Sequence, residues 1–549
     1  MGERIWLKHY PPGVAAEIDP DTYPSLPELI HDRALRFADN VAFSNFGARL
    51  SYRRYLQLGD SLGAWMQHAL HAGKGDRVAI MLPNIMQFPV AVYGSLRAGL
   101  TVVNINPLYS PRELQHQLID SGAETIIIEA SATPALAEIL HQTPIRNVIV
   151  TGVRDLVDED PAAVCADPRL TRCIEFTLAL REGAGLALRP VHVAGHDLAF
   201  LQYTGGTTGT SKGAMLTHRN LVANTLQSHT YFASSLRMGL EVYITALPLY
   251  HIFALTVNCL CCIYSGGLNV LITDPRDMPA FVKELARRPF TFITGVNTLY
   301  NGLLNTPGFS ELDFSALRTS IAGGMAAQRS VAEKWRRVTG CVLLEGYGLS
   351  ETSPTLAANP PGTTEFTGTI GLPVPSTEMS VRDEAGKPLP PGQPGELCAR
   401  GPQVMAGYWR RPDETAKVMT KDGFFRTGDI GIMDEQGRVK IVDRKKDMIA
   451  VSGFKVYPNE VEDFVMSHGG ILECAVVGVP DRHSGEVPKL FAVKKRPDID
   501  EAELREFMKN GLAGYKVPRY IEFRDELPKS NVGKILRREL RDEAATPAA

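Results

Sequence analysis

Through the first 350 residues, short apolar runs alternate with amphipathic segments. The runs are nearly unbroken in their apolarity and lie at 77–83, 101–107, 124–130, 146–152, 197–203, 242–248, 269–273 and 290–295. Between them, segments such as 111–122 and 278–289 place apolar residues at helical spacing. Strands that are apolar on both faces and alternate with helices are typical of parallel sheets covered on both sides. The pattern predicts an α/β fold.

The pattern changes twice further along the chain. From about residue 370 the sequence is rich in Gly and Pro and predicts short alternating strands, as in a small β-barrel subdomain. After residues 441–449 (IVDRKKDMI), strands and helices alternate in short units, and the chain closes with a basic helix, KILRREL, at 534–540. We therefore expect a multi-domain α/β protein with its principal domain boundary close to Asp443.

Composition narrows the class of protein. A chain of 549 residues is too long for one compact core, and its net charge of −3 gives no electrostatic reason to expect a nucleic acid partner. The eight cysteines show neither CxxC pairs nor Cys/His metal spacing, which is typical of a reduced, cytoplasmic protein. Residues 1–13 lack the apolar core of a signal peptide. The most apolar window, 252–264, is too short for a membrane span and predicts a buried helix.

The stretch YTGGTTGTSKG at 203–213 follows an apolar run and carries one charge, Lys212. Glycines let backbone N–H groups turn toward a ligand, hydroxyls add donors, and a lysine adds a point charge that suits phosphate. A flexible linker is the alternative, but a linker needs neither a strand before it nor a lysine at its end. It is not a Walker A motif, because Lys212 follows Ser211 and precedes Gly213. We expect phosphate binding.

Four further stretches carry candidate chemistry. In GYGLSET (346–352), Tyr347 can stack on a flat ring and Glu351 can hold a hard cation. In FFRTGDIG (424–431), Asp429 can accept hydrogen bonds from both hydroxyls of a ribose. The other two are DRKKDMIAVSGFKVYPNEVE (443–462) and PKSNVGKILRREL (528–540), in which Lys534 follows Gly533 at a predicted helix start. Taken singly, each is also explained by a strand-end turn, a turn aspartate or a solvated lysine.

Together and in this order, the five stretches resemble the serial core motifs of the adenylate-forming superfamily: acyl-CoA synthetases, firefly luciferases and peptide-synthetase adenylation domains. The resemblance covers nearly the whole chain. LPLYHIFALT (247–256), GVNTLYNGLLN (295–305) and the stretches 443–463 and 525–544 are most similar to bacterial long-chain fatty-acid–CoA ligases. The resemblance implies a large N-terminal domain (1–442) of two α/β subdomains and a small β-barrel, a hinge (443–447), and a small mobile α+β domain (448–549).

The resemblance also implies an ATP-dependent, AMP-forming acid–thiol ligase. Such enzymes join a carboxylate to ATP, release pyrophosphate, and pass the acyl group from acyl-AMP to the thiol of CoA. The implied ligands are a fatty acid, ATP, CoA and Mg²⁺. The implied ATP and AMP site comprises Thr204, Gly205, Gly206, Thr207, Thr208, Gly209, Lys212, Gly323, Gly324, Met325, Glu345, Gly346, Tyr347, Gly348, Leu349, Ser350, Asp429 and Arg444.

Four residues are implied to act in catalysis: Lys534, Glu351, Thr207 and His251. Lys534 would neutralise the negative charge that develops between the carboxylate oxygen and the α-phosphorus. Glu351 and Thr207, or Thr208 in its place, would hold Mg²⁺. His251 would lie near the acyl carboxylate, and an interior histidine bonded to the backbone is the alternative.

The small domain is implied to dock for the first step and to rotate for the second. The matching hinge residue is Lys446, and Ser452, Gly453 and Phe454 would lie along the CoA path, where glycine permits close approach. Some relatives carry a lysine near the position of Ala450 that assists the second step. Its absence leaves open which group supports thioester formation.

Several alternatives stay open: a medium-chain or aryl acid ligase, a fatty acyl-AMP ligase that serves a carrier protein, and a catalytically dead nucleotide-binding regulator. The joint presence of Lys534, Glu351, Asp429 and Lys212 argues against the regulator. A homodimer and peripheral contact with the inner face of the membrane are both compatible with the resemblance. Acyl chain length is not determined, although small and apolar residues in the 250–350 region are compatible with a long tunnel: Ala254, Leu255, Val257, Leu299 and Gly302.

Overall fold

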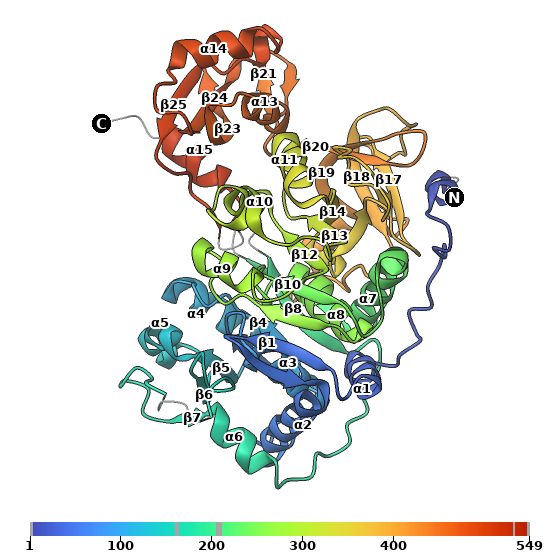
Figure 1. Ribbon diagram of the computed structural model, residues 1–549, viewed down its shortest axis with the longest axis vertical. Helices are drawn as coiled ribbons and strands as arrows, with labels where there is room; N and C mark the ends of the chain where they lie inside the picture. Colours follow the sequence, from blue (N-terminus) through green and yellow to red (C-terminus); the bar gives the residue numbers. More distant parts are fainter. Residues whose placement is uncertain (1–3, 160–163, 205–210, 531–532, 546–549) are drawn as a thin grey trace.

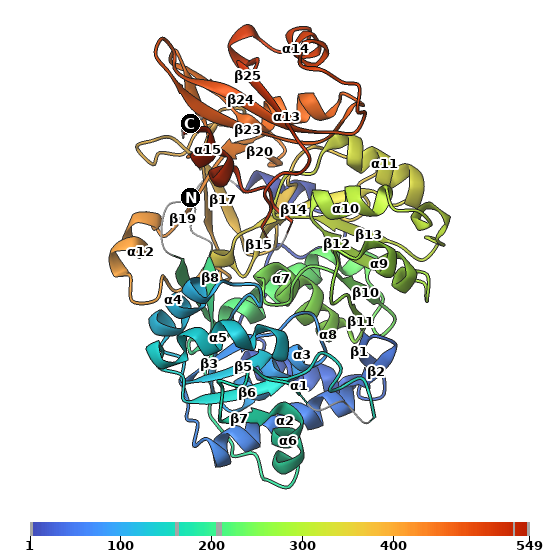
Figure 2. The same cartoon turned by 90° about the vertical axis from the view of Figure 1, so that its left-hand side faces the viewer.

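The computed structural model describes residues 4–159, 164–204, 211–530 and 533–545. Figure 1 shows a large body of sheets and helices with a smaller unit at one end, which begins near β21 and contains the C-terminal helix α15. In the perpendicular view of Figure 2 the same smaller unit lies on top of the body. The two-part organisation agrees with the predicted fold class.

The first large sheet has seven strands in the order β7-β6-β5-β3-β4-β8-β9. Its neighbours are parallel except for the β8–β9 pair. The strands are β3 (Arg77–Met81), β4 (Thr101–Asn104), β5 (Thr125–Glu129), β6 (Asn147–Thr151), β7 (Cys173–Glu175), β8 (Leu198–Thr204) and β9 (Lys212–Thr217). The five apolar runs predicted between residues 77 and 203 are therefore all strands of this sheet.

The second large sheet has nine strands in the order β16-β15-β14-β13-β12-β10-β11-β1-β2. The six neighbouring strands β14, β13, β12, β10, β11 and β1 are parallel to one another. The pairs at the two edges, β1–β2, β14–β15 and β15–β16, are antiparallel. The strands are β1 (Val41–Asn45), β2 (Ala48–Ser51), β10 (Val242–Thr245), β11 (Leu268–Leu271), β12 (Phe292–Gly295), β13 (Thr319–Ala322), β14 (Leu343–Gly348), β15 (Thr355–Ala358) and β16 (Leu372–Pro373).

Helices cover both sheets. They are α1 (Leu26–Arg36), α2 (Tyr52–Ala69), α3 (Gln87–Arg97), α4 (Pro111–Ser121), α5 (Thr133–Ile139), α6 (Phe176–Gly183), α7 (His218–Phe232), α8 (Cys261–Ser265), α9 (Met278–Leu285), α10 (Asn297–Leu304) and α11 (Arg329–Thr339). Local signals explain their ends: α4 begins at a Ser110–Glu113 capping box and ends at Gly122, which has a φ of +66°. The predicted buried helix at 252–264 is a π-helical segment, η5 (Ala254–Leu260), that continues into α8.

The two large sheets share one hydrophobic core. Buried side chains of α1, α2, α3 and α7 pack with residues of both sheets, such as Ile80, Phe200 and Ile244. The predicted α/β subdomains are thus joined along a common core, and we treat 1–442 as one proposed domain. Among the described residues, no helix combines the length and apolarity needed to cross a membrane.

The Gly- and Pro-rich region forms a four-stranded antiparallel sheet in the order β17-β18-β19-β20. Its strands are β17 (Glu378–Arg382), β18 (Gly395–Arg400), β19 (Phe425–Met433) and β20 (Val439–Arg444), and the short helix α12 (Pro412–Val418) lies between β18 and β19. The sequence predicts a small barrel here, whereas the described strands form an open sheet. The reason is that Met379, Leu397 and Val439 pack against Leu356 and Ala357 of β15, so its apolar face is covered without closure.

The small domain has a sheet in the order β22-β21-β24-β23, with β25 parallel to β24. Its elements are β21 (Ile449–Val451), β22 (Phe454–Val456), α13 (Pro458–Met466), β23 (Ile471–Asp481), β24 (Gly485–Lys494), α14 (Glu501–Lys509), β25 (Tyr520–Arg524) and α15 (Arg537–Ala545). Two clusters of buried residues, one on each face of this sheet, lie wholly within residues 449–544. A separate core is what an independently moving domain requires.

Candidate active site

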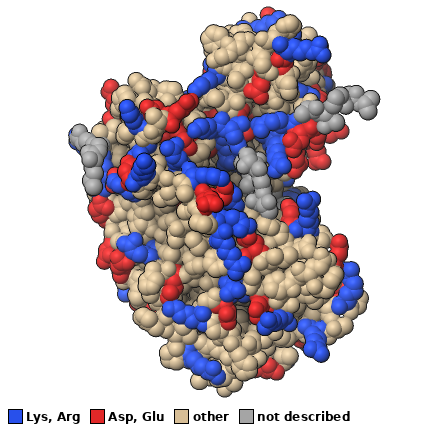
Figure 3. All heavy atoms as spheres, turned by 180° about the vertical axis from the view of Figure 1, so that it is seen from behind, with Lys and Arg blue, Asp and Glu red and all other residues tan. Residues whose placement is uncertain are grey.

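A cavity of about 2610 Å³ opens between the large body and the small domain. Its wall contains residues of β8, β9, β14, β19 and β20 and of the segment that precedes α15. Lys and Arg side chains gather around the hollow between the two units, as Figure 3 shows. The wall residues include Lys212, Arg411, Arg444, Lys446 and Lys534. Such a wall suits a polyanionic ligand.

Tyr347, Asp429 and Arg444 form one polar group in this wall. β19 pairs with β20 so that Asp429 lies directly opposite Arg444. The Tyr347 hydroxyl donates a hydrogen bond to Asp429 Oδ2 at 2.6 Å, and Arg444 Nε lies 3.5 Å from Asp429 Oδ1. Burial, and then the charge of Asp429, raises the pKa of Tyr347, so its hydroxyl keeps its proton at neutral pH. The residues predicted to contact adenine and ribose are therefore neighbours.

The glycines around this group permit a close approach of backbone segments. Gly323, Gly324 and Met325 follow β13 and line the cavity, and Gly324 has a φ of +78°, which favours glycine. A Cβ atom at Gly348 would lie 1.9 Å from the carbonyl oxygen of Pro354. Any larger residue at 348 would therefore displace the backbone beside Tyr347.

Glu345 also faces the cavity, together with Gly346. Its Oε1 accepts a hydrogen bond from the backbone N–H of Ala327 at 3.0 Å, while its Oε2 is buried and has no partner among the described residues. Burial raises the pKa of Glu345 to about 8. A ligand group in the cavity could therefore meet a neutral carboxyl group there.

The predicted phosphate loop joins two paired strands. Thr204 ends β8 and lies opposite Lys212, the first residue of β9. Gly205, Gly206, Thr207, Thr208 and Gly209 lie outside the described residues, so the roles predicted for them stay predictions. Lys212 lines the cavity and forms an ion pair with Glu414 of α12. A bound phosphate would compete with Glu414 for this lysine.

Glu351 lies on a short 3₁₀ turn, η7 (Ser350–Thr352), and lines the cavity with Leu349 and Ser350. Its Oε1 accepts a hydrogen bond from the Tyr408 hydroxyl at 2.7 Å. Burial raises the pKa of Glu351, as expected for a carboxyl group that has no cation beside it. The described residues contain no group of three or more His, Cys, Asp or Glu side chains that could hold a metal by itself. A metal at Glu351 would need further ligands from a substrate.

His251 lines the cavity at the end of the PLYH stretch. Its Nδ1 accepts a hydrogen bond from the backbone N–H of Phe253 at 3.3 Å, which leaves Nε2 as the donor of the neutral ring. Burial lowers the pKa of His251 to about 4, with a further contribution from Lys534. The ring is thus neutral at physiological pH. One nitrogen is bonded to the backbone, as expected for the alternative of an interior histidine, and the other is available as a donor.

Lys534 reaches the same cavity from the small domain. Among the described residues its ammonium group has no hydrogen bond or ion pair, although Arg444 and Asp429 are close enough to affect it electrostatically. Burial, and then the charge of Arg444, lowers the pKa of Lys534 to about 7. The lysine that the sequence singled out is therefore a partly buried amine beside the predicted nucleotide site.

The lowered pKa of Lys534 predicts a pH dependence. A group whose pKa falls to about 7 is protonated below that pH and neutral above it. If the ammonium form is required, kcat/KM for ATP in pyrophosphate release should decline above pH 7, because this parameter reports ionisation of the free enzyme. Lys534→Arg should move the declining limb to higher pH, since a guanidinium stays charged. A wild-type profile that is flat between pH 6 and 9 would contradict the requirement.

The predicted hinge residue lies in the cavity wall, whereas the residues predicted for the CoA path lie elsewhere. Lys446 is the third residue of a turn closed by the N–H of Asp447 donating to the carbonyl of Arg444 at 3.0 Å. Ser452 and Gly453 form the turn between β21 and β22, and Phe454 is 57 % exposed and stacks on Tyr515. Residues 452–454 do not line the cavity. In this arrangement of the domains they are separated from the predicted nucleotide site.

One part of the cavity wall is apolar: its residues pack together with Phe253, whose backbone N–H donates to His251. Val257 of η5 belongs to it, and a π-helix is a rare element that often marks functional sites. Of the five residues considered for a tunnel, Ala254, Leu255, Leu299 and Gly302 do not line the cavity. The apolar lining residues are instead Phe232, Leu236, Tyr243, Leu247, Val257, Cys261, Phe292, Val296 and Ile321.

Sequence reasoning missed the partners of the predicted residues. Tyr408 binds Glu351 from 57 positions away, and Glu414 pairs with Lys212 from 202 positions away. No local pattern marks Tyr408 or Glu414. They meet Glu351 and Lys212 only because the four-stranded sheet and α12 pack against the two large sheets.

Comparison with known proteins identifies the family. A model of the AMP-binding enzyme family matches residues 30–409, and a model of the AMP-binding enzyme C-terminal domain matches residues 460–534. A long-chain-fatty-acid–CoA ligase from Escherichia coli O6:H1 is 52 % identical, covering 99 % of this chain and 98 % of that protein. One from Bacillus subtilis is 38 % identical with the same coverage.

Solved structures agree with this assignment. The crystal structure of ATP-bound MatB from Rhodopseudomonas palustris superimposes with a TM-score of 0.81 at 29 % identity, covering 93 % of this chain and 98 % of that one. Fold, cavity and sequence thus lead to one conclusion: the chain belongs to the AMP-binding family of adenylate-forming enzymes.

Proposed function

We propose that this protein is an ATP-dependent long-chain fatty-acid–CoA ligase. The observation that carries the proposal is that one cavity combines a wall with several Lys and Arg side chains, the amine of Lys534, and an apolar wall that includes Val257 and Phe253. Similarity over the whole chain to long-chain-fatty-acid–CoA ligases supports the same activity.

In the first step the fatty acid carboxylate attacks the α-phosphorus of ATP, and pyrophosphate leaves. Tyr347 would stack on adenine while Asp429 and Arg444 hold the ribose, which orients the α-phosphate. Lys534 would approach the attacking carboxylate and the α-phosphate and offset their combined negative charge. The neutral His251 would donate from Nε2 to a carboxylate oxygen without adding charge.

Mg²⁺ fits the residues present. Glu351 is a buried carboxylate with one neutral donor, Tyr408, and its raised pKa indicates that its charge is not balanced by the protein. With phosphate oxygens as further ligands, Glu351 would hold the ion, and Thr207 is proposed as its neighbour. When bound, Mg²⁺ would neutralise charge on the β- and γ-phosphates.

In the second step the thiol of CoA attacks the acyl-AMP carbonyl and AMP leaves. We propose that the small domain turns about Lys446 for this step and brings Ser452, Gly453 and Phe454 toward the cavity. Lys455 lies directly across the β21–β22 hairpin from Ala450, so their side chains share a face of the sheet. Lys455 is therefore our candidate for the cation that some relatives carry near position 450.

The test of the proposed function is a competition among acids. The purified protein would be incubated with ATP, Mg²⁺, CoA and an equimolar mixture of acids from acetate to oleate, and mass spectrometry would identify every thioester. Mainly long-chain thioesters are expected. Short-chain or aromatic thioesters would overturn the chain-length assignment, and acyl-AMP without thioester would indicate a carrier-protein acceptor. Nucleotide binding without either product would indicate a regulator.

The apolar wall predicts how chain length can be altered. Val257→Trp should shorten the accommodated chain, because a larger side chain would fill space next to Phe232 and Cys261. Loss of burial for two to three methylenes costs ~1.6–2.4 kcal/mol, so the ratio of kcat/KM for palmitate to that for octanoate should fall roughly 15- to 60-fold. Val257→Ala is the matched control and should not lower this ratio. Equal losses for both acids would show that Val257 does not face the acyl chain.

A further inference from the structure

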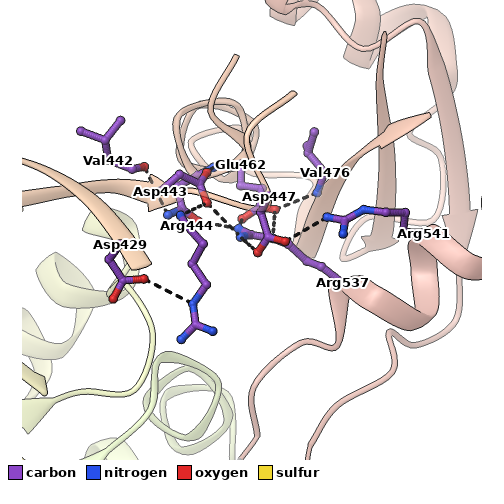
Figure 4. A network of polar contacts seen from close by, with 10 residues as sticks. Asp429, Val442, Asp443, Arg444, Asp447, Glu462, Val476, Arg537 and Arg541 are labelled. Atoms are coloured by element: carbon purple, nitrogen blue, oxygen red, sulfur yellow. Dashed lines mark hydrogen bonds and ion pairs between the residues drawn. The ribbon is translucent and has the colours of Figure 1, made fainter. Parts of the chain in front are cut away.

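A buried carboxylate at the end of β20 connects the two domains. Asp443 is fully buried, and its Oδ1 accepts a hydrogen bond from the backbone N–H of Arg444 at 2.7 Å. Its Oδ2 accepts the backbone N–H of Asn459, at the start of α13, at 2.9 Å. Arg537 Nη1 lies 3.5 Å from Oδ1. Figure 4 shows this carboxylate between the nucleotide side of the site, marked by Asp429, and the arginines of α15.

Arg537 is the centre of the network on the small-domain side. It is the first residue of α15, three positions after Lys534, and only 18 % of its side chain is exposed. Its Nε donates to Glu462 Oε1 at 3.0 Å, and its other nitrogens contact Asn459 Oδ1, Glu462 Oε2 and Asp447. One guanidinium therefore meets three carboxylates, and a planar group of five donors holds such a geometry well.

The segment that carries Lys534 is attached on both sides to residues that precede the proposed hinge residue, Lys446. Immediately before it, the carbonyl oxygen of Gly533 accepts a hydrogen bond from Thr298 Oγ1 of α10 at 3.0 Å. Three residues after it, Arg537 reaches Asp443. The ammonium group itself has no partner among the described residues, so these flanking contacts, rather than contacts of its own, determine where it lies.

The contacts divide at the proposed hinge residue, Lys446. Asp447 and Glu462 follow it, so their contacts with Arg537, and that of Asp447 with Arg541 at 2.9 Å, lie within the small domain and persist when it turns. Asp443 precedes it. Rotation about Lys446 would separate Asp443 from Arg537 and from the N–H of Asn459. The rotation would therefore break an ion pair and a hydrogen bond of a fully buried carboxylate.

We propose that Asp443 is a positioning residue for adenylation, which holds the small domain and Lys534 in the arrangement that the first step needs and releases Arg537 for the second. This inference rests on the proposed function. It predicts a selective loss: without the Asp443 carboxylate, acyl-AMP formation slows while conversion of supplied acyl-AMP to acyl-CoA does not, because the second arrangement does not use the contact.

The experiment compares Asp443→Ala with Glu462→Gln. The second substitution also removes a negative charge beside Arg537, but this charge belongs to the small domain. Both half-reactions are measured for wild type, Lys534→Ala and the two variants, with palmitate and with synthetic palmitoyl-AMP plus CoA. Asp443→Ala should lower kcat for pyrophosphate release about ten- to a hundredfold, since misplacement by an ångström can cost that much. Its KM for ATP and its thioester formation should change less than about twofold. Glu462→Gln should alter both half-reactions by similar factors.

The other outcomes are separable. A wild type that forms no acyl-AMP from any acid refutes the proposed function. With an active wild type, equal loss of both half-reactions in Asp443→Ala, or no loss, overturns the inference alone. A raised KM for ATP with unchanged kcat would show that Asp443 acts only through the backbone of Arg444. If Asp443→Ala fails to fold, Asp443→Asn is measured instead, because it keeps one acceptor for the N–H of Asn459. It should show a smaller loss of acyl-AMP formation alone. If Asp443→Asn shows no such loss, the inference is overturned as well.

Discussion

Replacement of Lys534 by alanine is expected to slow acyl-AMP formation by roughly a hundred- to a thousandfold, which corresponds to ~3–4 kcal/mol of transition-state stabilisation. Lys534 is the cavity-lining lysine that lies near Arg444 and Asp429, and without it the charge that develops between the carboxylate and the α-phosphorus would lose this ammonium group. Pyrophosphate release with palmitate as substrate measures this step.

The same variant should still convert supplied palmitoyl-AMP and CoA to palmitoyl-CoA, because the proposed rotation removes Lys534 from the cavity for that step. Lys529→Ala is the matched control. Lys529 belongs to the same segment and has the same charge, but it pairs with Glu473 at 2.8 Å within the small domain. It should change either rate less than about twofold, because its charge is balanced by Glu473 of its own domain. Equal loss of both half-reactions in Lys534→Ala would refute the assigned role.

A disulfide between residues 298 and 533 is expected to abolish the second half-reaction reversibly. A Cβ atom on residue 533 would lie 2.8 Å from Thr298 Oγ1, close to the ~3 Å that a disulfide places between a Cβ atom and the partner sulfur. Oxidised Thr298→Cys/Gly533→Cys protein would hold the small domain in the adenylation arrangement. Thioester formation from palmitoyl-AMP and CoA should fall on the order of a hundredfold, whereas pyrophosphate release should not fall on oxidation, and dithiothreitol should restore the first rate.

Comparison of the oxidised and reduced forms of one protein removes the effect of strain at residue 533, where glycine has a φ of +79°. The two single-cysteine variants, treated with the same oxidant, control for the native thiols, of which Cys165 is exposed. If the oxidised double variant forms thioester at the reduced rate, no domain rotation is needed and the assignment of Lys446 as hinge is wrong.

The amino-acid sequence by itself determined the elements and the positions of the motifs. The run 124–130 contains a strand because its consecutive residues Ile126, Ile127 and Ile128 point to both faces of the sheet, and both faces are buried. The capping residues Ser110 and Glu113 and the terminal Gly122 set the ends of α4 through contacts between near neighbours. The family and its order of motifs were likewise readable, because Tyr347, Asp429 and Lys534 each lie in a local pattern.

Tertiary structure alone decided which of these residues meet. Tyr408 reaches Glu351, and Arg537 reaches Asp443 across 94 positions, through the packing of sheets that no local signal specifies. The acyl wall shows the same limit: the apolar positions of 254–260 look alike in sequence, but Val257 faces the cavity whereas Ala254 and Leu255 face the core. Periodicity in the sequence indicates that one face of a helix is apolar. Only the elements packed around the helix determine whether that face meets the core or the cavity.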